Sequence, residues 1–352
     1  MTNTNLSFFD TTADGQKVFR IQLRNSHQDT AAFLSYGAAL SSFIVSEDSP
    51  DPEGRPVNLV LGYDTLKEYE ANDGCFGAIV GPFANRIAGA RYSIGENRYT
   101  IPSKNDIYAL HGGSVASLHD KVWDVESVSA ASVTFCYHAQ DGEGGFPGNR
   151  TFRVKYTLTD ARAIQIEYYA DTDRDTILNL CNHSYFTLSR TGGIKNCDVE
   201  VCADFYTPTD SDQIPTGEIR CVAGSDFDLR SPRSLSKIFE SENPEIMDVG
   251  NGLDHNFVLT KTSHASLQLA ARLSRTDTAH SISIYTTEPG VQVYTANWLT
   301  DRRGDHERRL RKYSGICFET QKFPDTPHHK NFPDAILKAN HSYRSTTIFQ
   351  YR

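Results

Sequence analysis

The stretch TFRVKYTL at residues 151–158 decides the fold class, because apolar and polar side chains alternate along it. Phe152, Val154 and Tyr156 are separated by an arginine and a lysine. Successive side chains of a β-strand point to opposite faces, so this pattern predicts a strand with one buried and one wet face. Strands of this kind are typical of antiparallel sheets.

The same alternation recurs along the chain. Ile164, Ile166 and Tyr168 continue it, and further strand-like runs are NLVLGY (58–63), TILNLC (176–181), CDVEVCADF (197–205), SISIYT (281–286), VQVYTANW (291–298) and TTIFQY (346–351). The helical signal is limited to short segments at 65–71 and 235–239. The glycine-rich stretch GEGGFPG at 142–148 indicates a long turn between two strands. Many strands with few helices predict an all-β sandwich or barrel, and we expect one domain over residues 1–352.

The composition narrows the class of partner. The chain of 352 residues has a net charge of -9 with 22% charged residues, which argues against a nucleic acid or an anionic membrane as the main partner. The most basic stretch, RRGDHERRLRK at 302–312, is interrupted by Asp305 and Glu307, so we interpret it as a solvated loop or short helix. No run approaches the length of a membrane span.

The cysteines indicate a reducing compartment. There are seven, an odd number, no CxxC pair occurs, and several lie in apolar runs such as VTFCYH and GICFE. We expect buried, reduced thiols. The sequence opens without a charged segment followed by an apolar run, so we expect no signal peptide and a cytoplasmic protein.

Two segments combine polar groups with turn residues. In ANRI (84–87), Asn85 and Arg86 offer amide and guanidinium donors between apolar neighbours. In LHGG (110–113), two glycines follow His111 and would let the backbone approach a ligand closely. Taken singly, each segment is equally compatible with an ordinary turn.

Further segments place polar groups inside strand-like runs. His183 stands in LCNHSYF, where a strand would hold it rigidly with a pKa suited to proton transfer near neutrality. Glu319 follows the apolar run SGICF, where desolvation would raise the pKa of its carboxyl toward that of a general base. Asp254 follows a glycine-rich turn, and Gln292 alternates with two valines. Each also has a plainer interpretation. His183 could be a core histidine hydrogen-bonded to the backbone, Asp254 could cap a turn, and Gln292 could face solvent.

Taken together, these segments resemble the galactose mutarotase (aldose 1-epimerase) family. The resemblance runs in family order from about residue 60 onward through ANRI (84–87), LHGG (110–113), NHSYF (182–186), TPTDSDQIPTGE (207–218), GLDHNF (252–257), TTEPGVQVYT (286–295) and FETQKFPD (318–325). It implies a large antiparallel β-sandwich whose concave face holds the sugar.

The resemblance also implies roles for individual residues. Glu319 matches the catalytic base, His183 the catalytic acid and His111 a second histidine that binds and polarises the sugar. Asn85 and Arg86 match the family's pair that contacts the ring substituents. Asp254 and Gln292 match the residues that hold sugar hydroxyls.

The implied reaction is that of an isomerase acting on a free aldohexose such as galactose or glucose. A base takes the proton of the C1 hydroxyl while an acid protonates the ring oxygen, the ring opens, and it closes on the other carbonyl face. This chemistry needs no cofactor and no metal, and His328 and His329 are interpreted as a polar loop. We expect a monomer or homodimer.

One departure and three alternatives accompany the resemblance. After Gln292 the chain has Ala296 where family members commonly have glycine. The alternatives are a hexose 6-phosphate substrate, a sugar-binding protein without activity, and a glycoside hydrolase with Asp254 as its second carboxylate. No clear basic pair beside the site supports the first, the presence of Glu319 and His183 argues against the second, and the histidine pair argues against the third.

Overall fold

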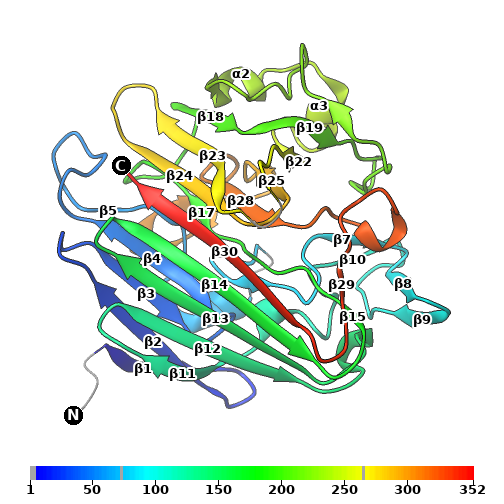
Figure 1. The fold of residues 1–352 in the computed structure, drawn as a ribbon. Helices are drawn as coiled ribbons and strands as arrows, with labels where there is room; N and C mark the ends of the chain where they lie inside the picture. The colour runs from blue at the N-terminus through cyan, green and yellow to red at the C-terminus, as the bar shows by residue number, and fades with distance from the viewer. Residues whose placement is uncertain (1–4, 72–73, 264–265) are drawn as a thin grey trace.

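The structure is a computed structural model and describes residues 5–71, 74–263 and 266–352. Antiparallel sheets dominate it (Figure 1). The largest sheet has nine strands in the order β11 (Asp124–Val128), β12 (Ser132–Ala139), β13 (Arg150–Thr159), β14 (Ala163–Thr172), β30 (Ser342–Tyr351), β24 (Ser281–Thr286), β23 (Gln268–Arg275), β18 (Cys197–Val201) and β21 (Arg233–Ser234). The predicted all-β sandwich is therefore confirmed.

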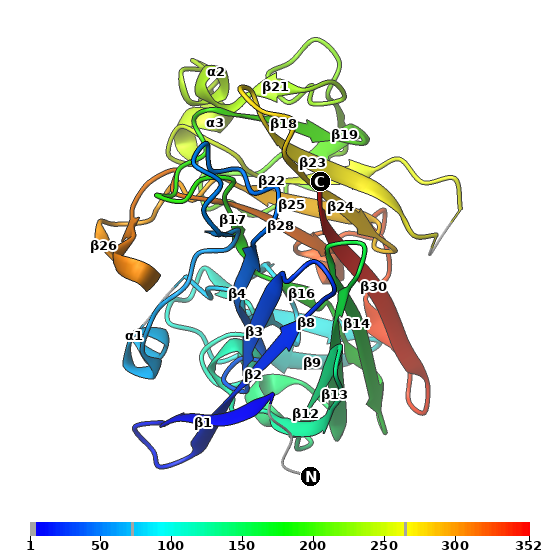
Figure 2. The same ribbon diagram turned by 90° about the vertical axis from the view of Figure 1, so that its left-hand side faces the viewer.

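A five-stranded sheet covers one part of this large sheet. Its order is β1 (Leu6–Thr11), β2 (Lys17–Arg24), β3 (Thr30–Leu34), β4 (Ala39–Val45) and β5 (Val57–Asn58). Figure 2 shows β2–β4 facing β12–β14 as two layers. Tyr156 of β13 links the layers, because its ring packs 4.6 Å from that of Phe33 and its hydroxyl donates to the Ala38 carbonyl at 2.7 Å.

A six-stranded sheet builds the other half of the molecule. Its order is β17 (Tyr185–Phe186), β28 (Ile316–Gln321), β25 (Gly290–Tyr294), β22 (Asp254–Leu259), β19 (Ala203–Thr207) and β20 (Arg220–Cys221). One face of it, with Phe257, Val291 and Phe318, belongs to the same buried hydrophobic cluster as Ile282 and Ile284 of the large sheet. The opposite face is left for polar groups.

Short elements connect these sheets. The two-stranded pairs are β6 (Ile79–Val80) with β16 (Cys181–Asn182), β7 (Arg86–Ala88) with β10 (Tyr108–Leu110), β8 (Arg91–Ile94) with β9 (Asn97–Thr100), β15 (Thr176–Ile177) with β29 (Ile336–Leu337), and β26 (Arg302–Arg303) with β27 (Arg309–Leu310). The helices are α1 (Leu66–Glu70), α2 (Leu235–Phe239), α3 (Pro244–Asp248), and the 3-10 turns η1 (Leu118–Asp120), η2 (Glu143–Gly145), η3 (Asp305–Glu307) and η4 (Thr326–His328). In the part of the chain that the structure describes, no helix is long and apolar enough to cross a membrane.

The local expectations are largely confirmed. Helix α1 begins after Thr65, whose side chain and that of Glu68 form a reciprocal capping box. The glycine-rich stretch 142–148 is the turn between β12 and β13 and contains η2. Four of the expected runs are not continuous strands. The run 197–205 is interrupted at Cys202, and the run 291–298 ends as a strand at Tyr294. The other two, 58–63 and 176–181, contain only short strand fragments. In the run 176–181, the amides of Leu178 and Asn179 donate to the carbonyls of Ala335 and Pro82, in loops outside a regular ladder.

Candidate active site

The polar face of the six-stranded sheet carries a row of functional side chains. The register places Asn256 of β22 opposite Gln292 of β25, and Gln292 opposite Glu319 of β28. The next row on this face contains Asp254, Tyr294, Cys317 and Tyr185. These side chains share a face because residues two apart on a strand point the same way. Gln292 and Glu319 are nevertheless buried, so the plain solvent-facing interpretation of Gln292 is wrong.

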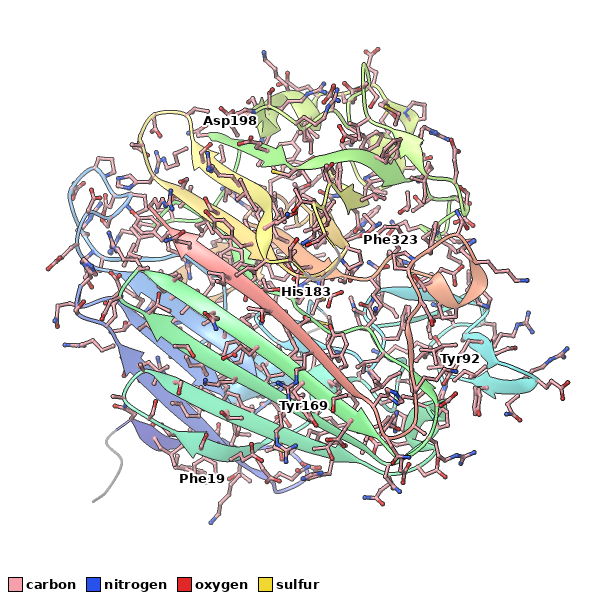
Figure 3. The ribbon with its side chains drawn as sticks, in the orientation of Figure 1. Phe19, Tyr92, Tyr169, His183, Asp198 and Phe323 are labelled. Atoms are coloured by element: carbon pink, nitrogen blue, oxygen red, sulfur yellow. The ribbon has the colours of Figure 1, made fainter. Side chains whose placement is uncertain are left out.

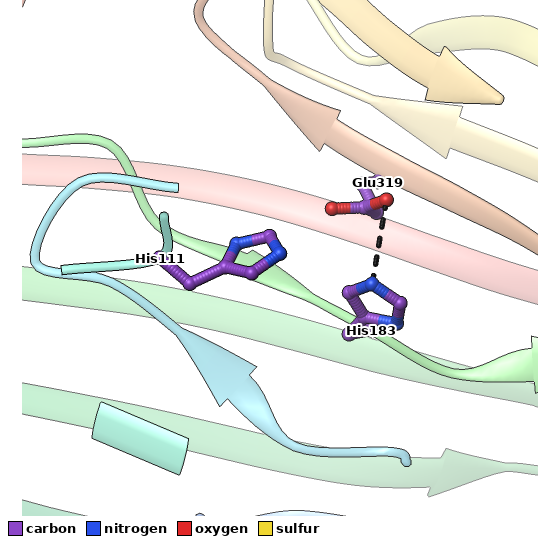
Figure 4. A group of neighbouring side chains, drawn as sticks. All are labelled: His111, His183 and Glu319. Atoms are coloured by element: carbon purple, nitrogen blue, oxygen red, sulfur yellow. Dashed lines mark ion pairs between the residues drawn. The ribbon is translucent and has the colours of Figure 1, made fainter. Parts of the chain in front are cut away.

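His183 approaches Glu319 from a neighbouring segment. Its Nε2 lies 3.6 Å from Glu319 Oε1, and side-chain exposure is only 7% for His183 and 3% for Glu319. Figure 4 shows these two side chains and that of His111 pointing toward one another, and Figure 3 places His183 near the centre of the molecule. A proton can be exchanged between such groups through one small motion or a bound hydroxyl.

The backbone around His183 differs from the expected strand. His183 falls between β16 and β17 rather than within a strand. It is still fixed, because its amide donates to the Ala78 carbonyl at 2.9 Å and its carbonyl accepts the Gly77 amide at 3.0 Å. The rigidity that catalysis favours is therefore supplied by these two bonds.

Burial shifts the pKa values of Glu319 and His183 in opposite directions. Desolvation, with a smaller effect of the nearby Asp254 carboxylate, raises the pKa of Glu319 to about 8. Desolvation also lowers the pKa of His183 to about 4. Near pH 7 these shifts favour a neutral pair, in which the Glu319 carboxyl carries the single proton. The nearby carboxylate does not keep His183 protonated, because the cost of burying the charged imidazole is larger.

His111 lies in a tight turn and is locked to Asn85. Both residues have positive φ, 51° for His111 and 64° for Asn85. The Asn85 amide donates to His111 Nδ1 at 3.1 Å, and the His111 amide donates to the Asn85 carbonyl at 3.0 Å. Burial, followed by the charge of His183, keeps the pKa of His111 well below its usual value. A neutral ring that accepts at Nδ1 must carry its proton on Nε2, so His111 is a hydrogen-bond donor toward Glu319 and His183.

The glycine after His111 is required by close packing. Gly112 has a φ of 95°, and a Cβ added to it would lie 2.3 Å from the Gly81 carbonyl oxygen. The HGG pattern is therefore a consequence of the backbone path that aims the histidine.

Arg86 and Asp254 supply opposite charges at the site. The Nη2 of Arg86 donates to the side-chain oxygen of Gln213, which reaches over from the loop between β19 and β20. The Nε2 of Gln292 donates to Asp254 Oδ1 at 2.7 Å. Burial raises the pKa of Asp254, while Arg86 and Gln292 oppose that shift.

Several buried polar atoms at this site have no hydrogen-bond partner among the described residues. They are Arg86 Nε, Gln292 Oε1, Asn256 Oδ1 and Gln321 Nε2. Buried polar groups are normally paired, so unpaired donors and acceptors on one face indicate a place for a polar ligand. A polyhydroxylated ring presents hydroxyls that can donate and accept at once.

Sequence reasoning missed four polar neighbours. Cys181 Sγ lies 3.7 Å from Glu319 Oε2, and Cys317 Sγ lies 3.6 Å from His183 Nδ1. Gln213 and Asn256 were within matched segments but were not singled out. Strand alternation could have identified Cys317, because it lies two residues before Glu319.

The same three residues could hold a metal ion. One ligand atom from each of His111, His183 and Glu319 lies within 4.8 Å of the other two. Two imidazoles and a carboxylate are a ligand set that zinc accepts, although bond lengths of about 2.0–2.2 Å would require these side chains to close in. His328 and His329 instead contact the buried Asp325, at 2.6 and 3.1 Å, as parts of a turn.

Comparison with known proteins agrees with this geometry. A family model described as aldose 1-epimerase matches residues 20–350. The chain is 36% identical to a galactose mutarotase from Mus musculus over 99% of this chain and 98% of that protein, and 30% identical to an aldose 1-epimerase from Escherichia coli over 96% of each.

Solved structures share the fold. The crystal structure of an aldose epimerase homologue from C. elegans superposes with a TM-score of 0.86 at 28% identity, covering 95% of this chain and 98% of that one. A galactose 1-epimerase from Lactobacillus acidophilus has a TM-score of 0.85 at 23% identity, covering 99% and 98%.

Proposed function

The chain belongs to the aldose 1-epimerase family, isomerases that interconvert the α and β anomers of an aldose, and we propose that Glu319 and His183 carry out this reaction on a free aldohexose. The observation that carries the proposal is the buried Glu319–His183 pair at 3.6 Å. Ring opening needs one group to accept the C1 hydroxyl proton and another to protonate the ring oxygen. One proton shared by two adjacent groups provides both at once.

The reactive form of the pair has its proton on His183. The Glu319 carboxylate then accepts the proton of the C1 hydroxyl, while the His183 imidazolium protonates the ring oxygen. The freed aldehyde rotates, and reversal of the two transfers closes the ring on its other face. Because both groups return to their starting state, the cycle consumes nothing and needs no cofactor or metal.

The remaining side chains bind and polarise the sugar in this proposal. His111 donates its Nε2 proton to a sugar oxygen, and Arg86 stabilises negative charge that develops during ring opening. Asn85 contacts a ring substituent. Asp254 and Gln292 hold hydroxyls, with Asp254 accepting because Gln292 and Arg86 favour its ionised form.

The wider proposal follows from the sequence. We infer one catalytic domain acting in the cytoplasm as a monomer or homodimer on a galactose- or glucose-like sugar. All seven cysteines lie outside disulfides and five of them are buried, which supports a reducing compartment.

Polarimetry tests the activity directly. Freshly dissolved α-D-galactose and α-D-glucose should approach their equilibrium rotations faster with the protein than without it. The Glu319→Gln variant should lose about a thousandfold or more in rate while still binding sugar, because it has lost a positioned base. Glu96→Gln is the matched control, since Glu96 is exposed in the β8–β9 turn.

Two outcomes would contradict the proposal. Failure to accelerate either sugar, with acceleration of glucose 6-phosphate instead, would move the substrate to a phosphorylated hexose. Near-normal turnover by Glu319→Gln would show that another group is the base.

A further inference from the structure

A hollow lined by basic side chains lies apart from the Glu319 site. It is a cavity of about 1300 Å³, walled by the loop 188–197 between β17 and β18 and by residues 308–314, which lead into β28. None of the seven residues assigned to the active site lines it. It therefore needs its own explanation.

The charge of this cavity is opposite to that of the protein. Its lining includes His306 and seven cationic side chains: Arg190, Lys195, Arg275, Arg308, Arg309, Arg311 and Lys312. No aspartate or glutamate occurs among the lining residues that the structure describes. The whole chain has a net charge of -9, so this concentration of positive charge is a local feature.

Three of these cations already have partners and shape the wall. Arg308 pairs with the buried Asp305 at 2.7 Å, Arg309 with Asp301 at 2.6 Å and Arg275 with Asp277 at 2.5 Å. These residues stabilise the loops and contribute little free charge.

Four cations remain available. Arg190, Lys195, Arg311 and Lys312 are exposed, and within the described residues none has a carboxylate at ion-pair distance. The ammonium groups of Lys195 and Lys312 lie 5.8 and 4.9 Å from the centre of the Tyr313 ring. Four like charges around one hollow repel one another, and an anion between them would relieve that repulsion.

The backbone between these cations is firmly held. The Gly193 amide donates to the Ser314 carbonyl at 2.8 Å, and the Ile194 amide donates to the Tyr313 carbonyl at 3.1 Å. The Tyr313 ring stacks on Phe239 with centroids 3.7 Å apart. The loop that brings Arg190 and Lys195 is thus joined directly to the segment that brings Arg311 and Lys312.

We propose that this cavity binds a small molecule with two or more phosphate groups. One phosphate group carries about -1.5 to -2 charges at neutral pH, so two phosphates match four free cations. Arginine and lysine are the side chains suited to phosphate, arginine as a planar donor pair and lysine as a point charge. The basic stretch 302–312, isolated in the sequence, acquires this role because the fold sets it beside Arg190 and Lys195.

Calorimetric titration of the full chain with sodium pyrophosphate tests the proposal, which does not depend on the proposed isomerase activity. We expect saturable binding at one site per chain that weakens as sodium chloride is raised. The double variant Arg190→Gln with Arg311→Gln should bind roughly tenfold more weakly or worse, because two charged donors are lost. The control Lys17→Gln with Arg98→Gln removes two exposed cations outside the cavity and should bind as the unmodified protein does.

Additional arms identify the source of the phosphate and guard against misfolding. Titration with ATP distinguishes a nucleotide from a simple diphosphate, and binding of either one supports the proposal. Citrate binding as tightly as pyrophosphate would overturn it, as would absence of saturable binding to both phosphate compounds or unchanged affinity in the double variant. A melting temperature of the double variant close to that of the unmodified protein should confirm that the variant is folded.

Discussion

The Glu319 site and the basic cavity use charged side chains in opposite ways. At the site, a few ionisable groups are buried and their pKa values are shifted, to about 8 for Glu319 and about 4 for His183. In the cavity, many groups of one sign remain exposed to water. Desolvation reverses the usual order of the two pKa values, so the pair keeps a single proton over a wide pH range, which suits proton transfer. Unpaired exposed charge instead suits recognition of an anion. The two regions should therefore respond differently to the same kind of change.

The largest expected difference concerns turnover. Replacing His183 with Asn removes the proposed proton donor to the ring oxygen and should lower kcat for galactose by about 10²–10⁴. Arg311→Gln in the cavity should leave kcat unchanged. Polarimetry on both variants measures the contrast, and an unaffected His183→Asn enzyme would point to His111 as the acid.

The second difference concerns pH and salt. In the proposed mechanism only the singly protonated Glu319–His183 pair is active, so kcat/KM should be level between about pH 4 and pH 8. Above pH 8 the shared proton is lost, and the rate should fall about tenfold per pH unit. Sugars carry no charge, so sodium chloride should hardly alter mutarotation while it weakens pyrophosphate binding. A rate that keeps rising through pH 9 would contradict the one-proton pair.

Stability gives a third, smaller contrast. The folded protein keeps the Glu319 proton up to about pH 8, whereas the unfolded chain loses it near the ordinary value of 4.5. The folded state thus binds more protons over this range, and the contribution to stability is lost as pH rises from 4.5 to 8. Glu319→Gln has no carboxyl to ionise and so lacks this loss. The melting temperature of the variant minus that of the unmodified protein should therefore be larger at pH 8 than at pH 5, by roughly a few degrees.

Cavity variants supply the comparison for that measurement. Arg190 and Arg311 are exposed, so their replacement by Gln should shift the melting temperature equally at both pH values. A pH-independent effect of Glu319→Gln would show that the carboxyl is already ionised in the folded protein at pH 5.

The smallest expected effect involves Ala296, which joins the two regions. It lies two residues beyond Tyr294 of the polar face, and its carbonyl accepts the amide of Tyr313 in the cavity wall at 3.3 Å. Its φ of 54° is unfavourable for a residue with a side chain. Ala296→Gly should therefore stabilise the protein by about 1 kcal/mol in urea unfolding. A destabilised variant would mean that the packing of the buried methyl group outweighs the backbone strain.

The sequence predicted strands and site residues by different means. Alternation alone predicted the strand at 151–158, because a period-two pattern is a local property of the sequence. It also predicted that Gln292 lies on the opposite face of its strand from Val291 and Val293. The approach of His111, His183 and Glu319 was expected only through the family resemblance, since long-range packing leaves no local pattern. The thiols of Cys181 and Cys317 were expected to be buried but not to contact Glu319 and His183.

The basic cavity illustrates the same limit. Residues 302–312 were interpreted alone as a solvated loop or short helix, and their partners Arg190 and Lys195 come from a segment more than one hundred residues earlier. The pairing of β17 with β28, together with the hydrogen bonds from the Gly193 and Ile194 amides to residues 313 and 314, brings the two segments together.

The position of β30 has a consequence for how the chain acquires its fold. This strand pairs with β14 on one side and β24 on the other, so it completes the middle of the nine-stranded sheet although it follows both in sequence. Until it is inserted, β14 and β24 each present an open edge of unpaired amides and carbonyls. Such edges recruit other chains, so during synthesis the protein passes through a period of exposure to aggregation. A chaperone that shields β14 and β24 would matter most in that interval, and loss of β30 would leave two half-sheets with self-associating edges.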